Sequence, residues 1–107
     1  MNILFVCSKN QWRSPTAEKV YERHAEINVR SGGTASSARH RVSLSDIQWA
    51  DCICVMEQKH KQRLLADFSQ ALARKSLHVL DIPDEYKFMD PELVSLIQSA
   101  VDPLLNA

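Results

Sequence analysis

Residues 3–15, ILFVCSKNQWRSP, join an unbroken apolar run to a polar loop. The four apolar residues at the start do not alternate with polar ones, a pattern typical of a strand covered on both faces. At the end of the stretch, Ser14 is a favourable helix N-cap and Pro15 a favourable first helical residue. The stretch therefore predicts strand, loop and helix in direct succession, with Cys7 at the end of the strand and Arg13 just before the helix.

Beyond this stretch, apolar strands alternate with amphipathic helices. Further strands are predicted at 27–31, 51–56 and 77–80, and helices at 14 to about 26, 46–49, 58–66 and from Asp90-Pro91 onward. Gly32-Gly33 is predicted to form the turn after the second strand, Ser43 or Ser45 to cap the short helix, and Pro103 to kink or end the last helix at Asp102. This order favours an α/β fold, a three-layer α/β/α sandwich around a four-stranded parallel sheet.

The bulk composition is that of an ordinary globular protein. A chain of 107 residues with 45% apolar residues fits a single domain over 1–107. The formal net charge of zero gives no electrostatic case for nucleic acid or an anionic membrane as the partner. No run is apolar enough for a signal peptide or a membrane span. Three cysteines are an odd number, and Cys52 and Cys54 alternate on one strand, so reduced thiols and a cytoplasmic setting are predicted.

The loop between Cys7 and Arg13 has the chemistry of an anion site. In open parallel sheets, ligands bind at the carboxyl ends of the strands, which is where Cys7 is expected. A loop that leads into a helix start turns backbone N–H groups toward one point. Arg13 can bind two phosphate oxygens through its planar fork, and the positive surroundings favour the nucleophilic thiolate at Cys7. Ser14 is placed to hydrogen-bond the sulfur, and Asn10 tolerates a left-handed backbone.

The spacing of a cysteine and an arginine by itself is a weak signal in a chain of this composition. On the alternative interpretation, Cys7 is a small buried apolar residue and Arg13 lies on the surface. The strand before the loop and the Ser-Pro helix start after it favour an active-site loop instead. We therefore expect Cys7 to attack a bound phosphate-like group.

Residues 7–18, CSKNQWRSPTAE, resemble the loop of the low-molecular-weight protein tyrosine phosphatase family, which reads C-x-G-N-x-C-R-S-P-x-A-E. Residues 30–34, 49–57 and 82–84 are similar to later segments of that family. The resemblance implies a flavodoxin-like fold, a phosphocysteine on Cys7 and phosphoryl binding by Arg13. It also implies an anion held by the rest of the loop: Ser8, Lys9, Asn10, Gln11, Trp12 and Ser14.

The same resemblance implies a substrate class and a general acid. The expected substrate is a phosphorylated protein or a small aryl phosphate, with inorganic phosphate or sulfate as a bound anion and no metal or organic cofactor. The acid is an aspartate, and Asp84 ranks first because it follows the last strand. Asp90 and Asp81 remain open, because the family's aspartate precedes a proline whereas Glu85 follows Asp84 and Pro91 follows Asp90.

This loop also departs from the family pattern. Lys9 stands in the position of a glycine and Trp12 in the position of a second cysteine, so the usual disulfide partner of Cys7 is missing. Trp12 either packs beneath the loop or forms a wall for an aromatic substrate. The segment between Thr34 and Arg39 is shorter than in the family, which predicts a shallower pocket.

Two other functions stay open on the sequence. One is arsenate reduction by thiols, for which Cys52 and Cys54 are poorly placed because a buried strand favours inert core thiols. The other is a noncatalytic phosphate-binding module. The histidines match no zinc spacing, and His60 is predicted to be a surface residue.

Overall fold

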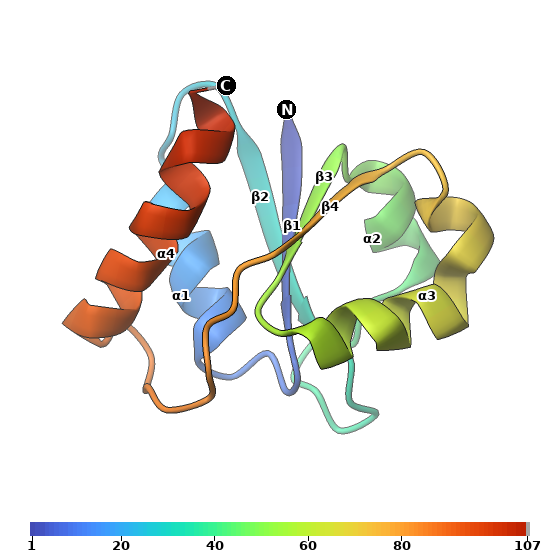
Figure 1. Ribbon diagram of the computed structural model, residues 1–107, viewed down its shortest axis with the longest axis horizontal. Helices are drawn as coiled ribbons and strands as arrows, with labels where there is room; N and C mark the ends of the chain where they lie inside the picture. The colour runs from blue at the N-terminus through green and yellow to red at the C-terminus, as the bar shows by residue number, and fades with distance from the viewer. Residues whose placement is uncertain (107) are drawn as a thin grey trace.

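The computed structural model describes residues 1–106. The elements follow in the order β1 (Asn2–Cys7), α1 (Arg13–Tyr21), β2 (Asn28–Gly33), α2 (Leu44–Trp49), β3 (Cys52–Val55), α3 (Gln58–Leu72), β4 (Ser76–Val79) and α4 (Pro91–Leu105). The strands form one four-stranded sheet in the order β2-β1-β3-β4, and every pairing is parallel (Figure 1). The predicted α/β class and strand–helix order are confirmed.

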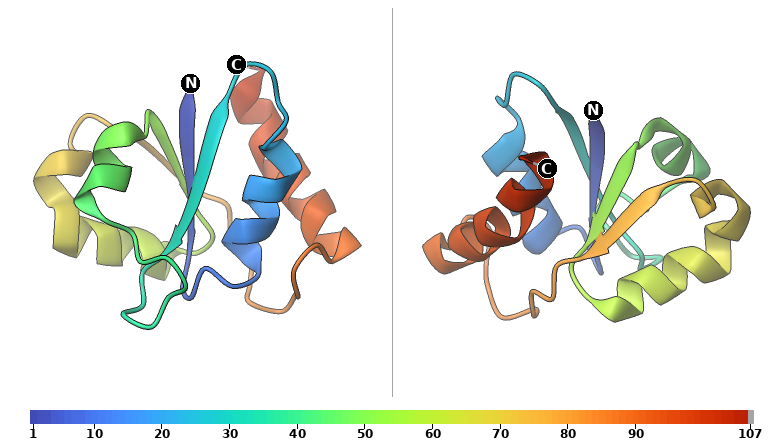
Figure 2. Two further views of the ribbon diagram at one scale, coloured as in Figure 1. Left: turned by 180° about the vertical axis from the view of Figure 1, so that it is seen from behind. Right: turned by 45° about the horizontal axis from the view of Figure 1, so that its top comes forward.

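Helices cover both faces of the sheet. α1 and α4 lie on one face, and α2 and α3 lie on the other, as the two views of Figure 2 also show. A hydrophobic core lies on each face of the sheet, and successive side chains of β1 point into one core and then the other. Ile3, Phe5 and Cys7 pack under α1 and α4, whereas Leu4 and Val6 pack under α2 and α3. Each fully buried aliphatic or aromatic side chain of this kind contributes roughly 1.5–3 kcal/mol, so the unbroken apolar run at the start of the chain accounts for the central strand.

The strand register places Cys7 at a switch in strand order. Cys7 pairs with Gly33 of β2, and Val6 pairs with Val55 of β3, so the chain leaves β1 between two neighbouring strand ends. Connections from β1 and β3 depart to opposite faces, which opens a crevice at this edge of the sheet. The loop after Cys7 occupies that crevice.

Three predicted details at helix ends are wrong. α1 begins at Arg13, and its N-cap Trp12 makes no side-chain capping bond; Ser14 lies inside the helix because its hydroxyl binds elsewhere. The helix ends at Tyr21 rather than near residue 26, since residues 22–26 are all exposed and bury no apolar face. Pro103 lies within α4, which continues to Leu105, because in the last turn the proline removes only one backbone hydrogen bond.

Three other local predictions have different outcomes. Gly32 and Gly33 are the last residues of β2 and not a separate turn. Ser43 caps α2, as one of the two predicted candidates, in a capping box with Asp46. α3 runs past the predicted end to Leu72, with a non-helical backbone at Phe68. No helix within residues 1–106 is both long and apolar enough to cross a membrane.

Candidate active site

The loop after β1 is held open by the side chain of Asn10. Asn10 adopts the left-handed conformation with φ 53°, as its residue type predicted. Its buried amide nitrogen donates to Ser14 Oγ at 2.9 Å and to Ser31 Oγ at 2.9 Å. Ser31 in turn donates to Glu18 Oε1 at 2.6 Å. This chain of hydrogen bonds ties the loop to β2 and α1 from behind.

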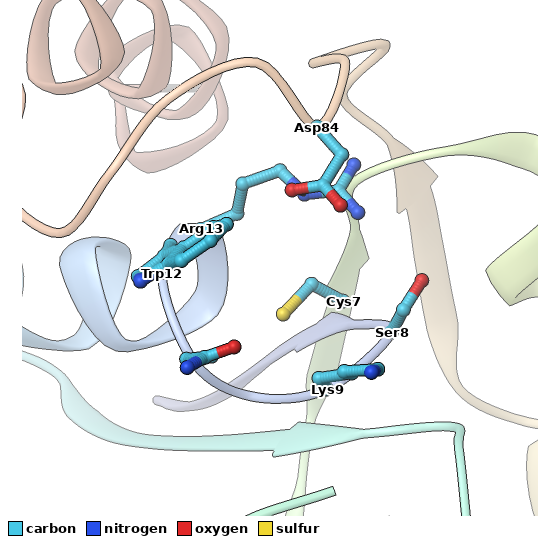
Figure 3. A pocket seen from close by; sticks show the side chains of 7 residues that line it. Cys7, Ser8, Lys9, Trp12, Arg13 and Asp84 are labelled. Atoms are coloured by element: carbon cyan, nitrogen blue, oxygen red, sulfur yellow. The ribbon is translucent and has the colours of Figure 1, made fainter.

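The Cys7 thiol points into the hollow that the loop encloses (Figure 3). Its sulfur lies 3.0 Å from Ser14 Oγ, the contact that the sequence predicted. The Ser14 hydroxyl accepts from Asn10, so its single hydrogen can be donated either to the sulfur or to the Gly32 carbonyl at 3.3 Å. A thiolate is the stronger acceptor, and the Cys7 contact is also the shorter one.

Arg13 is buried, with 2% of its surface exposed, so the interpretation of it as a surface residue is wrong. Its Nη1 donates to the Glu57 carboxylate and, at 2.8 Å, to the Ile82 carbonyl. These bonds use both Nη1 hydrogens, and within residues 1–106 the edge formed by Nε and Nη2 has no hydrogen bond. That edge is the fork that can bind two oxygens of one phosphate.

The Glu57 carboxylate balances the positive charge of the buried Arg13. Burial by itself would raise the pKa of Glu57, but the hydrogen bond and the positive charge of Arg13 lower it. Glu57 is therefore ionised at neutral pH, and the pair fixes the guanidinium in one orientation. Sequence reasoning did not identify this residue, which lies far from the loop in the chain.

His60 also belongs to the site, and its prediction as a surface residue is wrong. It is buried in the first turn of α3, where its Nδ1 accepts from the Glu57 backbone N–H at 3.0 Å. Nε2 consequently carries the hydrogen and donates to Ser8 Oγ at 2.8 Å. Burial, reinforced by the charge of Arg13, lowers the pKa of His60 to about 4. The spacing of Glu57 and His60 at a helix start resembles a capping box and was the available sequence signal.

Of the three candidate acids, only Asp84 reaches the cavity. Its carboxylate lies 3.6 Å from Arg13 Nε, and Figure 3 shows it beside the guanidinium at the mouth. Asp90 caps α4 by accepting from the Glu92 backbone N–H at 2.9 Å. Asp81 has a left-handed backbone with φ 57° and lines a different hollow.

The cavity above the loop has a volume of about 210 Å³. Its lining residues are Cys7, Ser8, Lys9, Gln11, Trp12, Arg13 and Asp84. Trp12 is 37% exposed and forms part of this wall, so the alternative that it packs beneath the loop is wrong. Asn10 and Ser14 are absent from the lining and hold the loop from below. The candidate substrate-binding residues thus divide into a lining set and a supporting set.

The loop also rests on the segment that follows β2. Thr34 N donates to the Cys7 carbonyl at 3.0 Å, Ala35 N to the Ser8 carbonyl at 2.9 Å and Arg39 N to the Lys9 carbonyl at 3.0 Å. Gly33 permits this close approach, because a Cβ there would lie 2.5 Å from the Ser8 carbonyl oxygen. This short segment, residues 34–39, therefore supports the loop between Cys7 and Arg13, which we call the anion loop, and we call the segment its backbone cradle.

The other two cysteines are separate from this cavity. Cys52 and Cys54 are free and buried in β3, with their sulfurs 4.0 Å apart. Both line another hollow, beside the N-terminal ends of the strands and the end of α4. Within residues 1–106, no three His, Cys, Asp or Glu side chains are gathered so that they could hold a metal ion.

No protein-family model and no curated protein matches the sequence. Solved structures do match over nearly the whole chain. Vibrio vulnificus Wzb in complex with benzylphosphonate is 22% identical with a TM-score of 0.79, and the match covers 98% of this chain and 97% of that one. A low-molecular-weight protein tyrosine phosphatase from T. tengcongensis is 18% identical with a TM-score of 0.78, over 99% and 98% of the two chains. The YwlE arginine phosphatase from Geobacillus stearothermophilus is 21% identical with a TM-score of 0.74, over 98% and 93%.

These matches establish the fold. The protein shares the parallel four-stranded sheet and helix layers of the low-molecular-weight protein tyrosine phosphatases, which confirms the resemblance drawn from the sequence at the level of architecture.

Proposed function

We propose that the protein is a cysteine-dependent phosphatase that hydrolyses phosphotyrosine or a similar aryl phosphate through a phosphocysteine on Cys7. The observation that carries this proposal is the shared cavity of Cys7 and Arg13: both residues line the same 210 Å³ hollow, and the Asp84 carboxylate lies at its mouth, 3.6 Å from Arg13 Nε. The fold of the matched phosphatases supports the assignment. We further propose that residues 1–107 form one domain and that the thiol works in a reducing, cytoplasmic setting.

In the first step the Cys7 thiolate attacks phosphorus. A P–S bond forms and the bond from phosphorus to the phenolic oxygen breaks, while Asp84 gives its proton to the departing oxygen. The Nε–Nη2 edge of Arg13 binds two of the three non-bridging oxygens, and backbone N–H groups of the loop bind the third. Glu57 and Ile82 hold the guanidinium in place, so little reorganisation accompanies the reaction.

In the second step the phosphocysteine is hydrolysed. The Asp84 carboxylate takes a proton from water, the water oxygen bonds to phosphorus, and the P–S bond breaks. The electron pair returns to sulfur, where the Ser14 hydroxyl 3.0 Å away stabilises the thiolate that leaves. Inorganic phosphate is then released, and Asp84 is again protonated for the next cycle.

An aromatic leaving group fits the mouth of the cavity. Trp12 is part of the wall and offers a flat apolar face against which a phenyl ring can stack. The matched Wzb structure holds benzylphosphonate, a phosphonate that carries an aromatic ring. The lining of the cavity and this comparison both support an aryl phosphate substrate.

The experiment that tests this function is hydrolysis of p-nitrophenyl phosphate by the wild-type protein and by Cys7→Ser. We expect phosphate release by the wild type and a loss of several orders of magnitude in the variant. Phosphate binding without turnover in the wild type would indicate a noncatalytic module instead. Arsenate-dependent thiol oxidation without phosphatase activity would indicate a reductase.

A further inference from the structure

A second hollow adjoins the proposed phosphate cavity. Gln11 lines both, so the two hollows lie next to each other at this residue of the loop. The second hollow has a volume of about 480 Å³, against about 210 Å³ for the first. Its walls come from α1, from Arg39 in the segment after β2 and from Phe88 before α4. A phosphorylated side chain in the first cavity would therefore place its neighbouring residues over the second, which we call the flanking groove.

The charges that line the flanking groove are unevenly compensated. Lys19 forms an ion pair with Glu22 at 2.8 Å, and Glu18 accepts a hydrogen bond from Ser31. Arg39 has no ion-pair partner among residues 1–106, and its side chain is exposed. Glu18 also forms no ion pair within residues 1–106, but its carboxylate is engaged by the Ser31 hydroxyl. The Arg39 guanidinium is the exposed charge without such a partner, and an acidic side chain would complement it.

The position of Arg39 is fixed relative to the phosphate cavity. Its backbone N–H donates to the Lys9 carbonyl at 3.0 Å, and the same segment is bonded to the loop through Thr34 and Ala35. Only the side chain of Arg39 has to be ordered when a partner binds, which keeps the entropic cost low. The backbone of Arg39 is therefore held beside the loop, and its side chain starts from a fixed point at the edge of the flanking groove.

Phe88 supplies the apolar part of the groove. Half of its surface is exposed (50%), although it lies in a hollow next to a charged residue. An exposed aromatic side chain inside a groove offers area that a partner's apolar side chain can cover. The combination of Phe88 and Arg39 matches a polypeptide better than a small phosphate ester.

We propose that the flanking groove binds the polypeptide next to the phosphorylated residue of a protein substrate and selects an acidic side chain there through Arg39. Phe88 packs against an apolar part of the same segment. This proposal rests on the proposed phosphatase function, since it names the class of protein substrate that the active site receives. It assigns Arg39 and Phe88 to substrate selection and gives them no part in the chemical steps.

The test compares three phosphotyrosine peptides that differ only in the residues next to the phosphotyrosine, which are Glu, Gln or Lys. Wild-type kcat/KM is expected to be about two- to five-fold higher for the Glu peptide than for the Gln peptide, the range for an exposed ion pair, and lowest for the Lys peptide. Arg39→Ala should abolish the Glu preference and Arg39→Glu should reverse it. Because the readout is a ratio between peptides, any change in the phosphate cavity itself cancels.

Arg74→Glu is the matched control, because it makes the same charge change at an exposed residue just before β4, at the opposite end of the sheet from Cys7. It should retain the wild-type preference, and Phe88→Ala should lower kcat/KM for all three peptides with little effect on p-nitrophenyl phosphate. Equal wild-type rates for the Glu and Gln peptides, or an equal loss of preference in Arg74→Glu, would overturn the proposal.

Binding of the same peptides to Cys7→Ser separates this proposal from the proposed function. If the wild type hydrolyses no aryl phosphate, the phosphatase assignment fails. The peptide affinities still test whether the flanking groove selects an acidic side chain. A Glu-over-Gln affinity ratio above one that disappears in the double variant with Arg39→Ala supports the groove. A ratio of one in Cys7→Ser contradicts it.

Discussion

Ser14 Oγ lies 3.0 Å from Cys7 Sγ and accepts a hydrogen bond from Asn10, so the serine hydrogen is directed toward sulfur or the Gly32 carbonyl. A bond from a hydroxyl to a thiolate is charge-assisted and contributes about 1.5–3 kcal/mol. This bond exists whenever the thiolate does, both before attack and after the phosphocysteine breaks down. Ser14 thus connects the hydrogen bonds of Asn10, which support the loop, to the sulfur that carries out the proposed reaction.

Ser14→Ala should therefore lower kcat for p-nitrophenyl phosphate by about ten- to a hundred-fold with a smaller change in KM. Steady-state rates of p-nitrophenol release measure both constants, and urea unfolding checks that the variant keeps its fold. An unchanged kcat would show that Ser14 only supports the loop.

Asp84→Asn should lower kcat about 10²–10⁴-fold, the usual contribution of a general acid. Asp90→Asn is the matched control, since asparagine caps a helix as well as aspartate does and should leave both folding and turnover near wild type. Steady-state rates with p-nitrophenyl phosphate measure both variants. A large loss in Asp90→Asn with normal turnover in Asp84→Asn would reverse the assignment.

Because His60 is buried, we expect the free energy of unfolding to fall at acidic pH. Its folded pKa of about 4 lies below the ordinary value of about 6.5, so the unfolded chain takes up the proton first. Stability is then fully present above about pH 6.5 and falls by about 3 kcal/mol as the pH drops toward 4. Urea unfolding at several pH values measures this loss.

His60→Gln should be less stable than wild type at pH 7 but should show a flatter pH profile between 6.5 and 4. Exposed His24 provides the control, because His24→Gln should keep the wild-type profile. The carboxylates whose pKa is lowered, Asp46 and Glu57, lose their contribution as the pH falls through the ordinary carboxyl pKa values of 3.8 and 4.5. The slopes are therefore compared between pH 6.5 and about 5, above the range in which these carboxylates contribute. Identical slopes for wild type and His60→Gln would contradict the account of His60.

Gly33→Ala should damage the active site more than the fold. The added Cβ would lie 2.5 Å from the Ser8 carbonyl oxygen and 2.9 Å from the Asn10 nitrogen, so the anion loop itself would have to move. In Gly32→Ala the nearest atom is the Val42 side chain at 2.8 Å, which lies outside the loop. We expect a much larger fall in kcat/KM for Gly33→Ala at comparable Tm changes. Equal activity losses would indicate a general effect on β2.

The sequence was sufficient for the parts of the site that are local. Cys7, Asn10 and Ser14 lie within one strand–loop–helix turn, so residue type and spacing predicted their arrangement. The place of Asp84 after the last strand likewise predicts its position, and of the three candidate aspartates Asp84 is the one that lines the cavity.

The remaining parts depend on tertiary contacts that no local pattern encodes. Glu57 and His60 reach the loop only because β3 pairs with β1, and burial of His60 follows from α3 packing over that edge. The backbone cradle from residues 34–39 likewise depends on the pairing of Cys7 with Gly33. A serine before proline locally favours the N-cap role for Ser14, but in the folded protein its hydroxyl contacts the Cys7 sulfur and the helix begins one residue earlier.

The central claim is that Cys7 carries the phosphoryl group, and rapid-quench mass spectrometry during turnover of p-nitrophenyl phosphate tests it most directly. The account predicts a phosphorylated peptide that contains Cys7, formed together with a burst of p-nitrophenol in an amount equal to the enzyme. Asp84→Asn should accumulate more of this adduct, because water activation is slowed. A phosphoryl group found on another residue, or steady turnover by Cys7→Ser, would contradict the account.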